Sequence, residues 1–407
     1  MGTMYRSLRR SLLGLPKSVW ALGLVSLFMD MSSELVHSLL PVFMGTVLGA
    51  SMVTIGLIEG IAEGVGTITK VLSGACSDFI RRRKLLLVIG YGLAALSKPL
   101  FPLASAIGWV FAARCVDRIG KGIRGAPRDA LIADITPTTS RGAAYGLRQA
   151  LDSVGAFLGP LLALVFMALL ANDITAVLWI AVVPALIAVA LLSAVREPQT
   201  LQSVRASGQR LKMAALWRLP RDLWLVVLLG SVFSLARFSE AFLVLRAVDV
   251  GLTVGLVPLI MIVMNVAYAL TAYPAGHAAD RGHQRALLLA GLAMLIAADL
   301  VLANARAVSA VFAGTALWGV HMGLTQGLLA QLVAAHAPDA QRGTAFGVFN
   351  LCTGVMLIVA SVMAGLLWDN FGAAATFAVA GGCAFVVAIM VLVYRPVWQT
   401  SGFAKRE

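Results

Sequence analysis

Twelve long apolar runs dominate this chain of 407 residues and restrict what it can fold into. Each run is long enough for an α-helix to cross a bilayer, which takes roughly 20 residues. Only helices and closed barrels span lipid, and the alternation typical of barrel strands is absent. The charged fraction of 13% is well below the ~25% of a soluble domain. The sequence therefore predicts an all-α membrane protein with twelve transmembrane helices, at residues 17–44, 52–75, 84–104, 107–127, 143–170, 173–195, 222–246, 252–275, 285–304, 308–333, 343–367 and 372–394.

The runs form two halves that resemble each other. The longest polar stretch, residues 196–221, follows the sixth run. We therefore predict an N-terminal six-helix bundle at 1–195, a cytoplasmic linker at 196–221 and a C-terminal six-helix bundle at 222–407. Short patterns recur in the two halves at a spacing of about 200 residues, such as Gly74 to Asp78 and Gly276 to Asp280, which indicates duplication of a six-helix unit. In transporters built from such repeats, the substrate site lies between the halves.

The net charge of +13 indicates how the chain is oriented. Basic residues gather at alternate ends of the apolar runs, as the positive-inside rule requires of cytoplasmic loops. These clusters are Arg6 to Lys17, Arg81 to Lys84, Arg118 to Arg128, Arg205 to Arg221, Arg281 with Arg285, and Lys405 with Arg406. The short loops near 45–52, 104–108 and 170–175 contain no Lys or Arg. We expect a multi-pass protein of the bacterial inner membrane with both termini in the cytoplasm, and no nucleic acid partner.

Two loop motifs give the chain a family resemblance. Residues 74–83 have the sequence GACSDFIRRR, and residues 276–285 have GHAADRGHQR. Both resemble the loop signature G-x-x-x-D-[RK]-x-G-[RK]-[RK] of the major facilitator superfamily, although Phe79 and Arg81 replace a basic residue and a second Gly. The resemblance implies the major facilitator fold, with two pseudo-symmetric six-helix bundles. It also implies a gating role for Gly74, Asp78, Arg82, Arg83, Asp280 and Arg281. A solvated loop charge is the alternative for Asp78.

The fifth run carries the pattern Gly146-x8-Gly155-x3-Gly159-Pro160-x2-Ala163. It is similar to the antiporter motif of the same superfamily, G-x8-G-x3-G-P-x-x-G, with Ala163 in place of the last Gly. The small residues let a neighbouring helix approach closely, and Pro160 interrupts the helical hydrogen bonds. The resemblance implies export coupled to inward proton flow, with Gly155, Gly159 and Pro160 in the gating machinery. Glycine packing without directional meaning is the alternative.

Ionisable residues inside the runs are functional candidates, because each costs at least roughly 2.5–3.5 kcal/mol to insert at the bilayer centre. Asp30, Glu34 and His37 stand at i, i+4 and i+7, on one helical face. A membrane carboxylate whose cationic partner moves away can bind and release a proton. We predict that proton coupling depends on Asp30, Glu34, Glu59, Glu63, Asp152, Arg114 and Arg148. A static network of buried ion pairs is the alternative.

The second half has fewer charges, so we expect it to form the more apolar side of the substrate-binding site. The predicted substrate-binding residues are His37, Arg237, Glu240, Met261, Met264, Asn265, Tyr268, Trp318, His321 and Gln326. Because Arg237 and Glu240 stand at i and i+3, mutual pairing is the alternative for them. Ordinary packing is the alternative for the methionines and aromatic residues.

Together these features predict a secondary active transporter that exports small organic molecules in exchange for protons by alternating access. A proton-coupled importer of a nutrient, a metal ion or a metal chelate is the alternative. We do not expect an enzyme, because the five histidines form no catalytic motif and the sequence has no P-loop. We expect a monomer without cofactor or bound metal, whose partners are a small-molecule substrate, protons and the lipid bilayer.

Overall fold

The structure is a computed structural model that describes residues 14–80, 82–197, 220–325, 327–338 and 341–393. Within these residues the chain is helical and has no strand, as the apolar runs predict. Nine helices in the described part are long and apolar enough to cross a membrane. The linker predicted at 196–221 lies almost entirely outside the described residues.

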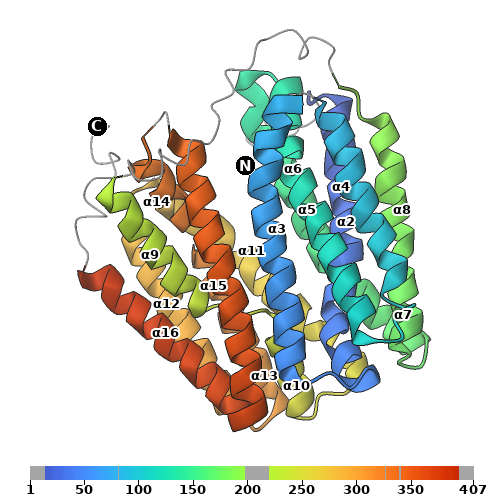
Figure 1. The fold of residues 1–407 in the computed structure, drawn as a ribbon, viewed down its shortest axis with the longest axis vertical. Helices are drawn as coiled ribbons and strands as arrows, with labels where there is room; N and C mark the ends of the chain where they lie inside the picture. The colour runs from blue at the N-terminus through green and yellow to red at the C-terminus, as the bar shows by residue number, and fades with distance from the viewer. Residues whose placement is uncertain (1–13, 81, 198–219, 326, 339–340, 394–407) are drawn as a thin grey trace, which may run out of the picture. The chain divides into compact units, whose positions relative to one another are not determined.

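The chain divides into two compact units. Unit 1 comprises Met1–Leu40 and Val65–Gly208, and unit 2 comprises Pro41–Gly64 and Gln209–Glu407. Unit 1 holds most of α2 (Lys17–Val42), the second part of α3 (Met52–Ile80), α4 (Arg83–Ser97), α5 (Ile107–Ile135), α6 (Arg141–Leu169), α7 (Ile174–Ile180) and α8 (Val182–Leu191) (Figure 1). Unit 2 holds the first part of α3, α9 (Arg221–Leu235), α10 (Ala241–Asp249), α11 (Pro258–Asp280), α12 (Gln284–Ala303), α13 (Val308–Thr325), α14 (Leu328–His336), α15 (Arg342–Phe371) and α16 (Ala373–Val393) (Figure 1).

Each predicted run corresponds to one helix or to a pair of short ones. The runs that do not reach the length and hydropathy of a membrane span are those of α4, α5 and the pair α9 and α10. Residues 236–240 separate α9 from α10 within a run that the sequence presents as continuous. Between α13 and α14, Gly327 has a φ of 76°, a left-handed conformation that glycine adopts without strain.

The grouping of the first part of α3 with unit 2 differs from the predicted division at the linker, and glycines explain the packing of that segment. Gly56, Gly60 and Gly64 form a ridge along α3 that lies on α15. A Cβ atom on Gly60 would lie 3.1 Å from the Cα atom of Ile358, so the two backbones are in close contact. This ridge therefore packs the first part of α3 on α15. The boundaries of the two six-helix bundles stay a prediction.

Helix α5 corrects one interpretation of the sequence. The apolar run predicts a helix over 107–127, and the basic cluster from Arg118 to Arg128 predicts a cytoplasmic loop at its end; the end of the helix and the loop are both wrong. The helix continues to Ile135 with Pro127 inside it. Arg118 and Arg124 are only 5% and 3% exposed. A buried charge needs a partner of opposite sign, and acidic side chains of α2 and α6 provide partners for this helix.

Two glycines give α5 close contacts on two sides. A Cβ atom on Gly120 would lie 2.6 Å from the carbonyl oxygen of Gly90 on α4. A Cβ atom on Gly122 would lie 2.6 Å from the Cβ atom of Thr69 on α3. Ser73 Oγ donates a hydrogen bond to the Gly122 carbonyl oxygen at 2.9 Å. Helix α5 is therefore held tightly enough to position the charges along it.

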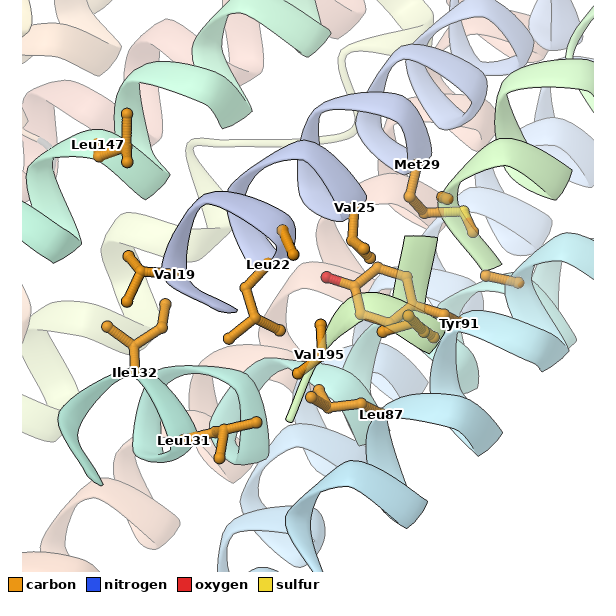
Figure 2. Packing of buried hydrophobic residues seen from close by; sticks show 14 of the residues in the cluster. Val19, Leu22, Val25, Met29, Leu87, Tyr91, Leu131, Ile132, Leu147 and Val195 are labelled. Carbon is orange, nitrogen blue, oxygen red and sulfur yellow. The ribbon is translucent and has the colours of Figure 1, made fainter. Parts of the chain in front are cut away.

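The apolar core of unit 1 covers one face of α2. Val19, Leu22 and Met29 recur at helical spacing and are at most 1% exposed. Figure 2 shows these side chains directed toward residues of α4 and α5, among them Tyr91. The Tyr91 hydroxyl lies 3.1 Å from Ser26 Oγ, where the apolar core meets a cluster of polar side chains.

Candidate functional site

Helix α6 packs against α2 at the two turns that carry Asp30 and Glu34. A Cβ atom on Gly155 would lie 2.5 Å from a backbone carbonyl oxygen of α2 and 3.2 Å from the Asp30 Cβ atom. A Cβ atom on Gly159 would lie 2.6 Å from the carbonyl oxygen of Met31, one turn further along α2, and 2.9 Å from the Glu34 Cβ atom. Real Cβ atoms do not approach backbone oxygens so closely, so the two glycines bring the helices together at the acids.

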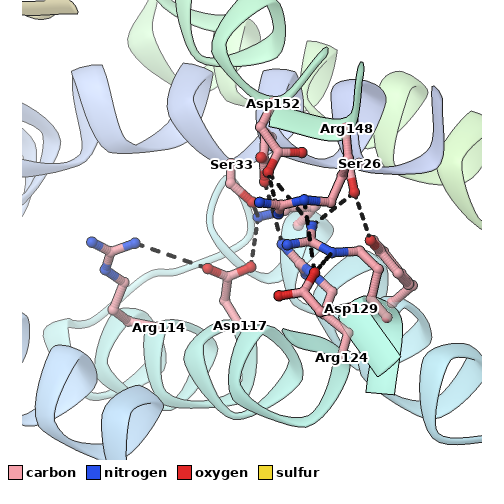
Figure 3. Close-up of polar contacts among 12 residues, drawn as sticks. Ser26, Ser33, Arg114, Asp117, Arg124, Asp129, Arg148 and Asp152 are labelled. Atoms are coloured by element: carbon pink, nitrogen blue, oxygen red, sulfur yellow. Dashed lines mark hydrogen bonds and ion pairs between the residues drawn. The ribbon is translucent and has the colours of Figure 1, made fainter. Parts of the chain in front are cut away.

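A nearly inaccessible ion pair of unit 1 joins Lys98 to Asp117 (Figure 3). Lys98 follows α4 directly and is 1% exposed. Its Nζ atom donates to Asp117 Oδ1 at 2.7 Å and to Ser33 Oγ of α2 at 2.9 Å. Arg114 Nη1 lies 3.9 Å from the other oxygen of Asp117. This carboxylate therefore has two cations, Lys98 after α4 and Arg114 on α5 itself, and Lys98 links it to α2 through Ser33.

Arg124 pairs with Asp30 across the gap between α5 and α2. Its Nη2 atom lies 3.6 Å from Asp30 Oδ1, which is beyond hydrogen-bond distance. The guanidinium group also lies over the Tyr91 ring, 4.7 Å from the ring centroid. The Asp30 side chain retains 21% exposure, against 3% for Arg124. A small shift of either helix would open this ion pair.

Two arginines share the carboxylate of Asp152 on α6 (Figure 3). Arg148 Nη1 donates to Asp152 Oδ2 at 2.8 Å, and Arg128 Nη1 lies 3.7 Å from the same oxygen. Arg128 Nη1 also donates to Ser26 Oγ at 2.8 Å. Asp129 accepts from Arg128 Nε at 3.3 Å and lies 3.7 Å from Arg148 Nε. The cluster therefore links α2, α5 and α6 by charge.

Glu34 and His37 form a second pair on α2. Glu34 Oε2 lies 3.5 Å from His37 Nδ1, and the two side chains are 19% and 9% exposed. A carboxylate next to an imidazole can share one proton between the two groups. The predicted placement of both residues on one face of the helix agrees with this contact.

Five predicted coupling residues lie in the polar cluster of unit 1: Asp30, Glu34, Arg114, Arg148 and Asp152. Sequence reasoning did not select four further members of the cluster, which are Lys98, Asp117, Arg124 and Arg128. The recurrence of cations every three to four residues along α5 was the available signal. The same recurrence is expected of a basic cytoplasmic loop. Only the packing of α5 shows that these cations lie on a buried face of a helix.

The other two predicted coupling acids, Glu59 and Glu63, belong to the part of α3 in unit 2. Glu59 is fully buried, and Ser239 Oγ donates to its Oε2 at 3.5 Å. Ser239 lies between α9 and α10, and its backbone N–H donates to Ser361 Oγ of α15 at 3.2 Å. Glu63 is half-buried. These acids are therefore associated with the interrupted helix of unit 2.

An aromatic cluster in unit 2 surrounds two of the predicted substrate-binding residues. The His321 ring lies 5.7 Å from Phe233 and 6.5 Å from Trp318, measured between ring centroids. His321 Nδ1 lies 2.8 Å from the Gly291 carbonyl oxygen, so the hydrogen is on Nδ1. Among the described residues, neither His321 Nε2 nor Trp318 Nε1 has a hydrogen-bond partner, although both are buried. The Arg237 guanidinium lies 5.8 Å from the Phe233 ring centroid.

The remaining predicted substrate residues lie mostly on α11. Met261 and Met264 are buried, and Gly319 of α13 packs on the Met264 backbone. The half-buried residues are Asn265, Tyr268 and Glu240. Gln326 lies outside the described residues.

The predicted gating residues are only partly described. Arg83 pairs with Asp134 at the end of α5, and its backbone N–H donates to Glu197 at 2.7 Å. A Cβ atom on Gly74 would meet Ala126 at 3.6 Å, an ordinary contact. The Asp78 side chain lies outside the described residues. Three other predicted gating residues are exposed: Arg82, Asp280 and Arg281.

The chemistry available in this part of the molecule is proton binding and charge pairing. Across the described ranges, no group of three or more His, Cys, Asp and Glu side chains could hold a metal ion. Several carboxylates of unit 1 have cationic partners at separations from 2.7 to 3.9 Å. Such acids can change protonation when the distance to the partner changes.

Comparisons with known proteins agree on one family. The sequence profile of the Major Facilitator Superfamily matches residues 22–247 and 240–406. An uncharacterised MFS-type transporter of Methanocaldococcus jannaschii is 32% identical over 362 residues, which cover 87% of this chain and 89% of the relative. An uncharacterised protein of Mycobacterium tuberculosis is 29% identical over 357 residues, which cover 86% of each chain.

Solved structures show the same fold at low sequence identity. The nucleoside transporter NupG has a TM-score of 0.76 with 12% identity, over 92% of this chain and 99% of that one. The human organic anion transporter MFSD10 has a TM-score of 0.64 with 17% identity, over 92% of this chain and all of the other.

Proposed function

This chain belongs to the major facilitator superfamily, and we propose that it exports small organic molecules in exchange for protons. Its family and fold are those of multi-pass secondary transporters that carry small-molecule substrates. The direction of transport, the coupling ion and the substrate are the parts that we propose.

One observation carries the proposal. Gly155 and Gly159, from the pattern that resembles the antiporter motif, are the residues that place α6 against Asp30 and Glu34. The motif and the acids are far apart in the sequence, and neither the periodicity nor the composition requires that they meet. A movement of α6 along α2 would therefore change the surroundings of both acids directly.

The proton steps follow from how the acids are paired. Asp30 has Arg124 at 3.6 Å, without a hydrogen bond. When that pair opens, the carboxylate loses the charge that favours its ionised form and takes up a proton. Closure of the pair expels the proton again. Glu34 with His37, and Asp152 between Arg128 and Arg148, supply further acids whose charge depends on a partner.

On the substrate side, the proposal uses the aromatic cluster of unit 2. Trp318 Nε1 and His321 Nε2, which have no hydrogen-bond partner within the described ranges, offer a donor and an acceptor inside the aromatic cluster. Most binding sites for small organic molecules are lined by apolar and aromatic side chains and contain a small number of polar groups. His37, Arg237, Glu240 and the α11 residues named above complete the proposed set.

The remaining features belong to the same proposal. Alternating access would be gated by Gly74, Asp78, Arg82, Arg83, Asp280 and Arg281, and by Pro160 beside the two α6 glycines. Coupling through Glu59 and Glu63 would involve the interrupted helix of unit 2. We also propose that the protein is a monomer of the bacterial inner membrane, with both termini in the cytoplasm and a division into two six-helix bundles at residues 196–221.

The test uses the purified protein in liposomes that enclose a pH-sensitive dye. A panel of organic compounds is added, and proton movement is followed for the native protein and for Asp30→Asn and Glu34→Gln. We expect at least one compound to evoke proton movement with the native protein, and we expect both variants to fold but to lose that response. Asp173→Asn is the matched control, because Asp173 caps α7 through the Ala176 N–H and Asn can serve as a cap too.

Two results would reject the proposal. A proton response that persists unchanged in both variants would remove Asp30 and Glu34 from coupling. Uptake of a compound driven by the proton gradient, instead of expulsion, would favour the importer of a nutrient, metal ion or metal chelate.

A further inference from the structure

Unit 2 contains a buried acid that the proposed mechanism does not use. Asp299 lies one turn before the end of α12 and has no exposed surface. Neither of its carboxylate oxygens has a hydrogen-bond partner among the described residues. It is also the only acidic residue of this helix, whose residues from Ala286 to Ala303 are otherwise apolar. Such a group needs an explanation, because native structures rarely leave buried polar atoms unsatisfied.

Asp299 is closely packed between helices. Helix α16 approaches it through Gly381, where a Cβ atom would lie 3.3 Å from the Asp299 Cβ atom and 3.8 Å from Oδ2. Helix α13 packs along α12 on another side. The site is closed, and its walls offer no group that resembles a metal ligand set in the described residues.

The titratable groups of the neighbouring helices do not neutralise an ionised Asp299. Cys383 on α16 is near enough to interact with it electrostatically, but a thiol carries no positive charge. His321 on α13 uses Nδ1 for the Gly291 carbonyl oxygen. Arg246 on α10 donates instead to the carbonyl oxygens of Leu302 and Ala305, and it pairs with Asp249.

We propose that Asp299 is a proton-binding site of unit 2, occupied by a proton in this conformation. An ionised carboxylate without donor or cation in such a place would cost far more than the neutral acid. The proton can leave only when the contact between α12 and α16 loosens enough to admit water or a base. The site is separate from Asp30 and Glu34, and it does not depend on the direction of transport.

Infrared difference spectroscopy tests the proposal on the purified full-length protein at pH 7. The native spectrum minus that of Asp299→Asn should contain the C=O stretching band of one protonated carboxyl group per chain. Asp249→Asn is the matched control, and its difference spectrum should lack that band because Asp249 pairs with Arg246. Asp299→Leu serves as a second variant if the asparagine variant does not fold.

The outcomes separate this site from the proposed function, because the measurement needs no substrate. Absence of the band in the difference spectra overturns the proposal. A band that appears only after sodium is replaced by choline also overturns it, because a metal cation would then occupy the carboxylate. If neither variant folds, the native protein is titrated, and the lack of any protonated carboxyl band at pH 7 rejects the site.

Discussion

The glycines of the α6 pattern should respond in opposite ways to the same substitution. At Gly159, a Cβ atom would lie 2.6 Å from one backbone atom of α2 and 2.8 Å from another. At Gly146, on the same helix, nothing lies within 4 Å of the added atom. Replacement of a helical Gly by Ala gains roughly 0.5–1 kcal/mol in either case. Overpacking costs about 1–3 kcal/mol, and of these two variants it affects Gly159→Ala alone.

The helix propensity is common to both variants and cancels when they are compared. We therefore expect Gly159→Ala to be less stable than Gly146→Ala by about 1–3 kcal/mol, the overpacking cost alone. Gly146→Ala should be at least as stable as the native protein. Gly155→Ala should behave like Gly159→Ala, since its Cβ atom would lie 2.5 Å from a carbonyl oxygen of α2.

Unfolding of the three variants in one set of mixed micelles, followed by tryptophan fluorescence, measures these differences. The proton response in liposomes is recorded in parallel, and Gly146→Ala should retain it. Equal stabilisation of Gly146→Ala and Gly159→Ala would refute the reasoning. In that case α6 does not contact α2 through Gly159, and the geometric link between the motif and the acids is lost.

Two further predictions concern single contacts. Lys98→Met should cost about 3–5 kcal/mol of unfolding free energy, because it removes the closest cation of the buried Asp117; a loss below about 1 kcal/mol in the same micelle assay would contradict a buried ion pair. Asp369→Ala should cost about 0.5–2 kcal/mol, as the loss of a helix N-cap does, since its carboxylate accepts from the Met52 and Val53 N–H groups at 3.1 and 2.9 Å. Unchanged hydrogen exchange at the start of α3 in that variant would count against this role.

A static network requires ion pairs that stay closed, whereas the coupling mechanism requires ion pairs that open and close. Lys98 and Asp117 are nearly inaccessible and joined by a short hydrogen bond, which suits a permanent structural pair. Asp30 is more exposed and has its cation beyond hydrogen-bond distance. The cluster of unit 1 thus contains both kinds of contact, and the alternatives need not exclude each other.

Much of the architecture follows from the sequence alone. Apolar runs of this length have to be helical in lipid, because apart from a closed β-barrel only an α-helix pairs all of its backbone N–H and C=O groups there. The family follows from the loop motifs, and the face shared by Asp30, Glu34 and His37 follows from the helical repeat. The packing role of Gly56, Gly60 and Gly64 was also predictable, since small residues in register leave a groove for a neighbouring helix.

Only the tertiary structure decided which charges are buried and which residues pair. The cations of α5 have the same spacing whether they face solvent or a carboxylate, so Arg124 could not be assigned to Asp30 from the sequence. Lys98 and Asp117 lie on different helical segments, and their contact depends on how closely Gly90 and Gly120 let α4 and α5 approach. A helical repeat determines which residues share a face, whereas the neighbour of that face is set by packing among segments distant along the chain.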